Sequence, residues 1–195
     1  LPADIKKTKF IKWEKPVETH PRIELLQNFS EQSPYYTLSN KNEIVFSGSQ
    51  TIDELIYIPA GYQVRVKPGT KIDFVNRGGL ILNDRLSMVG TATEPIKIMS
   101  SDSSSQGITV LEADSVLVAH VEMTGLNCLD YKGWTLTGAF NVYESYTSIQ
   151  HLKIAYNQCE DALNLIRSEF KIEDLWIGYT PSDGFDADFC TGILN

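Results

Sequence analysis

Short runs of alternating apolar and polar residues dominate the chain from Thr51 onward, and glycine, asparagine, aspartate and serine separate the runs. Such alternation is typical of strands that bury one face, whereas a helix needs apolar residues every three or four positions over a longer stretch. No stretch with sustained helical periodicity occurs in this part of the sequence. The pattern therefore predicts an all-β protein.

The strand pattern also repeats along the chain. One apolar trio recurs 23 positions further on: Ile149, Leu152 and Ile154, then Ile172, Leu175 and Ile177. The same trio occurs 31 positions earlier, as Val118, Val121 and Met123. We interpret 23 residues as one turn of a solenoid, and we assign the extra eight positions to an insertion at Leu129–Leu136.

A second strand in each turn reads apolar, polar, apolar. Its members are Ile108–Val110, Phe140–Val142, Leu163–Leu165 and Phe185–Ala187. A repeat of about 20 to 30 residues built from short strands cannot bury its own apolar face, so stacked turns must share one core. A β-sandwich is the alternative, but it needs hairpin turns and gives no reason for the repeated apolar spacing.

Two segments, 62–74 and 79–98, carry a resemblance to a known superfamily. They contain a Pro68-Gly69-Thr70 turn before one strand and a Gly90-Thr-x-x-x-Pro-Ile96 stretch before another. In these features the chain resembles bacterial right-handed β-helix proteins of the pectin-lyase-like superfamily, over Ile52 to Asn195. The resemblance implies a right-handed parallel β-helix. It leaves the activity open, because the superfamily includes lyases, hydrolases, epimerases and adhesins.

The domain organisation follows from the repeat. We expect residues 1–50 to form an N-terminal cap and the segment leading into the solenoid, because an open solenoid end exposes apolar core. Pro21–Asn28 has apolar residues at helix-compatible spacing within this cap. Residues 51–195 are expected to form the β-helix, truncated at its C-terminal end, because Asp183–Asn195 begins a new turn. A C-terminal continuation of the same solenoid is therefore expected.

Composition restricts the partners. The net charge is −8, and only the first fifteen residues concentrate lysine and arginine, so we expect no nucleic-acid partner. No apolar run reaches the length of roughly 18 residues that a transmembrane helix needs. The chain starts at Leu1 without an initiator methionine or a signal core, so we expect a processed form. The β-helix resemblance favours a secreted, periplasmic or cell-surface location.

An acidic cluster is the first candidate site. Asp183, Asp186 and Asp188 lie within six residues, and Asp161 lies one turn earlier. Carboxylate oxygens are calcium ligands, so the cluster could bind calcium or substrate. The alternative is a polar ladder on the outer face of the solenoid, in which Asp186 follows two asparagines of earlier turns.

Histidines suggest a second site. His120 and His151 are 31 positions apart, and Asp174 follows 23 positions later, so all three should line one corner. Such a column could bind a transition metal or orient a proton-transfer pair. The alternative is an exposed corner whose side chains hydrogen-bond along the stack.

Aromatic residues suggest a carbohydrate platform. Tyr156 and Tyr179 are 23 positions apart and should stack, with Trp176 beside them. Flat exposed rings pack against the apolar faces of sugars, although stacked rings in successive turns also serve as ordinary packing.

Two cysteines are also in register. Cys128 and Cys159 are 31 positions apart, which places them on adjacent turns within reach of a disulfide if the protein is exported. Free stacked thiols are the alternative, because the third cysteine, Cys190, leaves an odd count.

The function that these features favour is an exported or cell-surface β-helix module, non-catalytic, that binds carbohydrate or acts as a structural or adhesive scaffold. The alternative is a polysaccharide lyase or glycoside hydrolase fragment acting on uronate-containing polysaccharide. Lyase chemistry needs a basic group to remove a proton, and the nearest candidates are Arg167 and Lys171. A spacer that binds nothing is a third possibility.

Overall fold

The protein is built entirely from strands in the part that its structure, a computed structural model, describes: residues 29–39 and 42–195. A front sheet contains β1 (Thr37–Leu38), β2 (Glu43–Phe46), β3 (Ser49–Ile52), β5 (Gln63–Val66), β6 (Lys71–Phe74), β8 (Leu86–Val89), β9 (Ile96–Met99), β11 (Val116–Thr124), β15 (Tyr146–Ala155), β17 (Glu169–Gly178) and β19 (Thr191–Leu194). A back sheet contains β4 (Leu55–Ile58), β7 (Gly79–Leu82), β10 (Ile108–Leu111), β14 (Gly138–Tyr143), β16 (Asp161–Ile166) and β18 (Asp183–Asp188). No helix long and apolar enough to span a bilayer is found among these residues.

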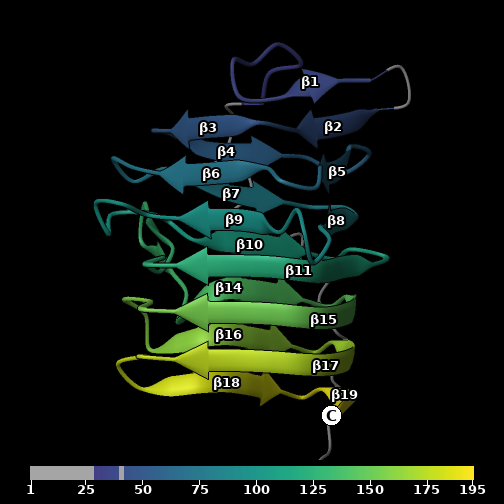
Figure 1. Cartoon of the computed structure of the whole chain (residues 1–195), viewed down its shortest axis with the longest axis vertical. Helices are drawn as coiled ribbons and strands as arrows, with labels where there is room; N and C mark the ends of the chain where they lie inside the picture. Colours follow the sequence, from purple (N-terminus) through teal and green to yellow (C-terminus); the bar gives the residue numbers. More distant parts are fainter. Residues whose placement is uncertain (1–28, 40–41) are drawn as a thin grey trace, which may run out of the picture.

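The chain coils from the front sheet to the back sheet and returns one rung further along the axis (Figure 1). All strand pairs within the two sheets are parallel except β1 with β2. In Figure 1 the front strands run to the left, the back strands run to the right behind them, and the chain descends, so the coil is right-handed. The predicted parallel β-helix is confirmed, with about seven turns.

The repeat predicted from the sequence is the register of the sheets. Ile149 pairs with Ile172 of the next rung and with Val118 of the previous rung. On the back sheet Phe140 pairs with Leu163, which pairs with Phe185. Each inward column is apolar because the same face turns inward in every rung. Stacking these columns produces one continuous core between the sheets.

The insertion at Leu129–Leu136 forms a small hairpin of β12 (Asp130–Tyr131) and β13 (Trp134–Thr135). It packs on the outer face of the back sheet and buries a second apolar cluster there. The buried members are Leu55, Tyr57, Ile81, Leu111, Leu129 and Trp134. The hairpin therefore covers a surface that the strand alternation alone would leave exposed.

Residues 29–38 cover the N-terminal end of the core. Phe29, Tyr35, Tyr36 and Leu38 pack against it. The first rung begins with β2 (Glu43–Phe46), so the parallel stack begins inside the segment that we assigned to the cap. Pro21–Asn28, with its helix-compatible spacing, lies outside the described residues. Continuation of the solenoid beyond Asn195 stays a prediction.

Corners of the coil are made by residues with left-handed backbone, stacked in columns. One column contains His120, His151 and Asp174, with φ of 50°, 52° and 56°. This conformation is uncommon outside glycine and changes the direction of a strand. Because the corners repeat, the side chains that follow each corner also fall into columns along the axis.

A buried ladder of hydroxyl and thiol groups stabilises another corner. The backbone N–H of Ala113 donates to Ser145 Oγ (2.9 Å), that of Ser145 to Ser168 Oγ (3.2 Å), and that of Ser168 to Cys190 Sγ (3.4 Å). Each side chain thus satisfies a backbone donor of the previous rung, which a buried corner requires.

Candidate functional site: an exposed aromatic patch beside a histidine groove

Tyr156 and Tyr179 form the centre of an exposed aromatic patch. They follow β15 and β17, and their rings stack with centroids 4.5 Å apart and planes 1° apart. The predicted stacking is therefore confirmed. The two residues are 53% and 69% exposed. Gly125 precedes Tyr156 in the same corner column, so the previous rung contributes no corner side chain to stack on the Tyr156 ring.

Trp176 extends the patch along β17. Its indole ring is 44% exposed and lies edge-on to Tyr179, with centroids 6.4 Å apart. The ammonium of Lys153, the equivalent residue one rung earlier, stands 5.0 Å from the centre of the indole ring. Lys153 makes no ion pair within the described ranges, and its ammonium makes a cation–π contact with the ring. We call Tyr156, Tyr179, Trp176 and Lys153 the aromatic patch.

A groove of about 300 Å³ adjoins the patch at Lys153. The loop between β8 and β9 forms one side of it, and β11 and β15 form the other. Its lining residues are Thr91, Ala92, Pro95, His120, Val121, Glu122, His151 and Lys153. Its volume is at the lower end of the range for small-molecule sites. Because Lys153 belongs to both, the groove and the patch form one continuous surface on the front sheet.

The histidine column lies at one corner as predicted, and two of its members, His120 and His151, line this groove. The rings of His120 and His151 stack with centroids 4.4 Å apart and planes 23° apart, and His151 Nδ1 lies 2.5 Å from Asp174 Oδ2. Nitrogen lone pairs lie in the ring planes, so nearly parallel rings cannot direct theirs at one ion. The geometry therefore fits hydrogen bonding along the column better than a metal site.

The acidic cluster does not converge either. Asp161 pairs with Asp183 and Asn164 with Asp186, but Asp188 belongs to a different column. Burial, and then the charges of Asp186 and Asp183, raise the pKa of Asp161. In residues 29–39 and 42–195, no three His, Cys, Asp or Glu side chains are grouped so that they could hold a metal ion. The calcium hypothesis thus gains no geometric support.

The polar ladder proposed for the outer face exists, but its asparagines are buried. Asn141 is fully buried and Asn164 is nearly so. Asn141 Nδ2 donates to the carbonyl of Gly138 (2.7 Å), and Asn164 Nδ2 donates to Thr137 Oγ1 (2.8 Å). The ladder is therefore part of the packing, and it offers no open surface at these two rungs.

All three cysteines are free in the structure. Cys128 and Cys159 nonetheless lie together, because Gln158 N donates to the carbonyl of Leu126 and so continues the register of β11 and β15. The Cys159 thiol hydrogen-bonds to Cys128 and lowers the pKa of Cys128, while the pKa of Cys159 is raised. The predicted proximity is confirmed, and the disulfide stays a prediction.

Neither candidate for a catalytic base is free to act. Arg167 Nε lies 2.7 Å from Glu144 Oε1, and Lys171 Nζ lies 2.8 Å from Glu173 Oε1. The Lys171–Glu173 contact raises the pKa of the lysine and lowers that of the glutamate. The ion pair therefore favours the charged form of Lys171, which cannot accept a proton.

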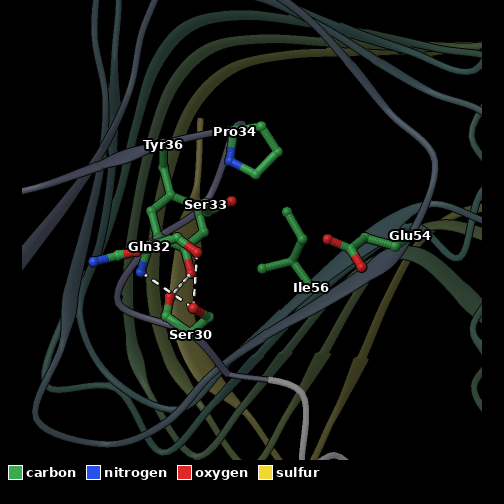
Figure 2. A pocket seen from close by; sticks show the side chains of 7 residues that line it. All are labelled: Ser30, Gln32, Ser33, Pro34, Tyr36, Glu54 and Ile56. Carbon is green, nitrogen blue, oxygen red and sulfur yellow. Dashed lines mark hydrogen bonds between the residues drawn. The ribbon is translucent and has the colours of Figure 1, made fainter.

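A second hollow lies at the N-terminal end, between the cap and the start of β4 (Figure 2). It holds about 60 Å³ and is lined partly by Ser30, Tyr36 and Glu54. Tyr36 OH donates to the Ser30 carbonyl (2.5 Å) across one side of it. This volume fits a few water molecules and no larger ligand.

The sequence pattern missed the groove, Lys153 of the aromatic patch, and Gly178 beside the indole ring. Lys153 lies 23 positions before Trp176 and could have been found from the repeat. Gly178, against which the indole ring packs, and the loop side of the groove had no signal in the periodicity.

Comparisons with protein-family models, with curated proteins and with solved structures give no match for this chain.

Proposed function

We propose that the protein is a non-catalytic, exported or cell-surface solenoid module that binds carbohydrate through its aromatic patch. The observation that carries this proposal is the gathering of Tyr156, Tyr179 and Trp176 on two successive rungs, all substantially exposed. Soluble proteins rarely leave large rings exposed side by side unless the surface binds something.

The chemistry of the patch suits a sugar ring. The indole face offers a flat apolar surface to the C–H face of a pyranose, and such contacts contribute where water is excluded. The Lys153 ammonium beside the ring is a donor for a sugar hydroxyl or carboxylate. The adjoining groove supplies further polar groups from His120, His151 and Thr91. An oligosaccharide can therefore contact the apolar and polar parts of this surface together.

The export and the bacterial, pectin-lyase-like origin rest on the sequence motifs. Pro68–Thr70 lies between β5 and β6, with Gly69 at φ 72°, and Gly90–Pro95 lies between β8 and β9. Both motifs therefore act as corners in consecutive rungs, as the resemblance implies. A secreted or surface location also suits a binding partner that is a polysaccharide or another surface macromolecule.

Polysaccharide cleavage is the weaker alternative. It needs a base beside acidic groups, and both Arg167 and Lys171 are held by glutamates. No observation in the described residues favours it over binding.

A glycan array probed with the purified chain tests the proposal, followed by calorimetric titration of the best oligosaccharide. Trp176→Ala and Tyr179→Ala should each weaken binding by about tenfold or more, equivalent to about 1.4 kcal/mol. Phe189→Ala is the matched control, because Phe189 is an exposed aromatic corner residue outside the patch. Absence of binding to every glycan, or unchanged binding in both patch variants, would overturn the proposal.

A further inference from the structure

Cys128 and Cys159 occupy equivalent positions of successive rungs, next to the root of the β12–β13 hairpin. The insertion begins immediately after Cys128, and the Cys128 thiol donates to the carbonyl of Thr137, where the hairpin returns to the solenoid (3.7 Å). The carbonyl of Thr137 also accepts the N–H of Asp161, just after Cys159. The two thiols thus lie where the hairpin joins two rungs.

The geometry of this position suits a disulfide. Equivalent residues of parallel neighbours lie about 4.8 Å apart, within the Cα separations of roughly 4.4–6.8 Å that disulfides accept. The backbone hydrogen bond from Gln158 to Leu126 continues the register of β11 and β15 up to both positions. We propose that Cys128 and Cys159 form a thiol–disulfide modification site, which a small disulfide such as oxidised glutathione oxidises and which then fastens the hairpin root to the next rung.

The two thiols have different parts in the reaction. Cys128 is partly exposed and Cys159 is 1% exposed, so an oxidant reaches Cys128 first. The hydrogen bond from Cys159 also favours the thiolate of Cys128, which is the reactive form.

The oxidation proceeds in two exchanges. The Cys128 thiolate attacks one sulfur of oxidised glutathione, forms a mixed disulfide and releases one glutathione thiolate. Cys159 then loses its proton to solvent and attacks the Cys128 sulfur, which releases the second glutathione. In total two protein thiols are oxidised to one disulfide, and one molecule of oxidised glutathione is reduced to two of reduced glutathione.

Oxidation should restrain the hairpin. The hairpin covers the second apolar cluster on the back sheet, and Lys132 lies exposed in the turn between its two strands. Opening of the hairpin requires movement of the chain that starts at Cys128. A bond from Cys128 to the next rung removes this freedom, so cleavage by trypsin after Lys132 should become slower.

The experiment incubates the full chain with oxidised glutathione and maps its peptides by mass spectrometry without reductant. A cross-linked peptide pair containing Cys128 and Cys159 is expected, and Cys190 should remain outside it. Cys159→Ser should trap glutathione on Cys128, Cys128→Ser should leave Cys159 unmodified, and Cys190→Ser should behave as the native chain does. Trypsin cleavage after Lys132 should slow on oxidation of the native chain but not of Cys128→Ser.

Three results would overturn the inference. The first is a native chain that keeps both thiols free, the second is a cross-link that involves Cys190, and the third is equal cleavage after Lys132 before and after oxidation. Because the mapping uses the native chain, a variant that fails to fold does not remove the test.

Discussion

The indole ring of Trp176 lies so close to the backbone of Gly178 that a β-carbon at Gly178 would stand 2.6 Å from its Cη2 atom. The ring therefore takes its place in the aromatic patch only because the residue two positions later has no side chain. One rung earlier, the residues equivalent to Trp176 and Gly178 are Lys153 and Ala155. The side chain of Lys153 carries no ring. A glycine is thus needed at this rung and not at the previous one.

Gly178→Ala should displace the indole ring without removing any aromatic residue. Glycan binding should weaken by about threefold to tenfold, while the free energy of unfolding should change by less than about 1 kcal/mol, because a surface side chain can move away from the added methyl group. Titration of the best-bound oligosaccharide and chemical denaturation measure the two effects. Undiminished binding would show that the position of the indole ring does not matter to the site.

The core register makes a prediction about two isoleucines. Ile149 is fully buried between Val118 and Ile172, whereas Ile193 in β19 is 58% exposed. Ile149→Ala should lower the free energy of unfolding by about 2–5 kcal/mol, because it opens a cavity in the stacked core. Ile193→Ala, the control with the same chemical change, should cost less than about 0.5 kcal/mol. Equal losses in urea denaturation would contradict the assigned register.

How much the sequence could predict depends on whether a residue is repeated. The 23-residue spacing placed Ile149 on Ile172 and Tyr156 on Tyr179, because parallel stacking converts a fixed spacing into contact. The alternation of apolar and polar residues also predicted that Asn141 lies on the outer face of its strand. It could not predict that Asn141 is buried, with its amide held by the Gly138 backbone and Thr109 Oγ1, because alternation does not encode these contacts.

The groove was unpredictable for a similar reason. Its loop side, which includes Thr91 and Pro95, belongs to a connection between β8 and β9 that has no equivalent in the later rungs. His120 and His151 were predictable as a column, yet the space beside them depends on where that loop lies. The periodic features of the sequence therefore predicted the stacked rungs, whereas the shape of the groove depends on segments that do not repeat.

The hydroxyl ladder makes a prediction about Ser168. Its Oγ accepts the N–H of Ser145 and donates to the carbonyl of Ile166 (3.0 Å) in a buried corner. Ser168→Ala should lower the free energy of unfolding by about 1–3 kcal/mol, because the buried N–H of Ser145 loses its acceptor. Ser168→Cys should restore part of this loss, since Cys190 already accepts an N–H in the same column.

The matched control for the ladder is Ser148→Ala, on the outward side of β15, where the change should stay within about 0.5 kcal/mol. Urea denaturation of the three variants checks the order. A Ser168→Ala protein as stable as the native one would mean that the ladder does not contribute.

Asp161 makes the pH dependence of stability testable. Burial first, and then the charges of Asp186 and Asp183, raise its pKa above the ordinary value of 3.8. At a pH below the ordinary pKa, Asp161 is protonated in both the folded and the unfolded chain, so it does not lower the free energy of unfolding. As the pH rises, the unfolded chain loses this proton first, so the folded chain binds more protons and its stability falls. The loss of stability reaches its full size once the pH exceeds the raised pKa of the folded chain.

Asp161→Asn removes this cost and keeps an amide oxygen that can accept the bond from Asn164 Nδ2, now 3.3 Å from Asp161 Oδ2. The variant should therefore be more stable than the native chain near neutral pH, and the gain should disappear as the pH falls below 3.8. Asp188→Asn, at an exposed carboxylate in another column, is the matched control. Urea denaturation across the acidic range measures both differences. A constant difference at every pH would mean that Asp161 is not the group whose ionisation opposes folding, because only a proton bound unequally by the two states produces a slope.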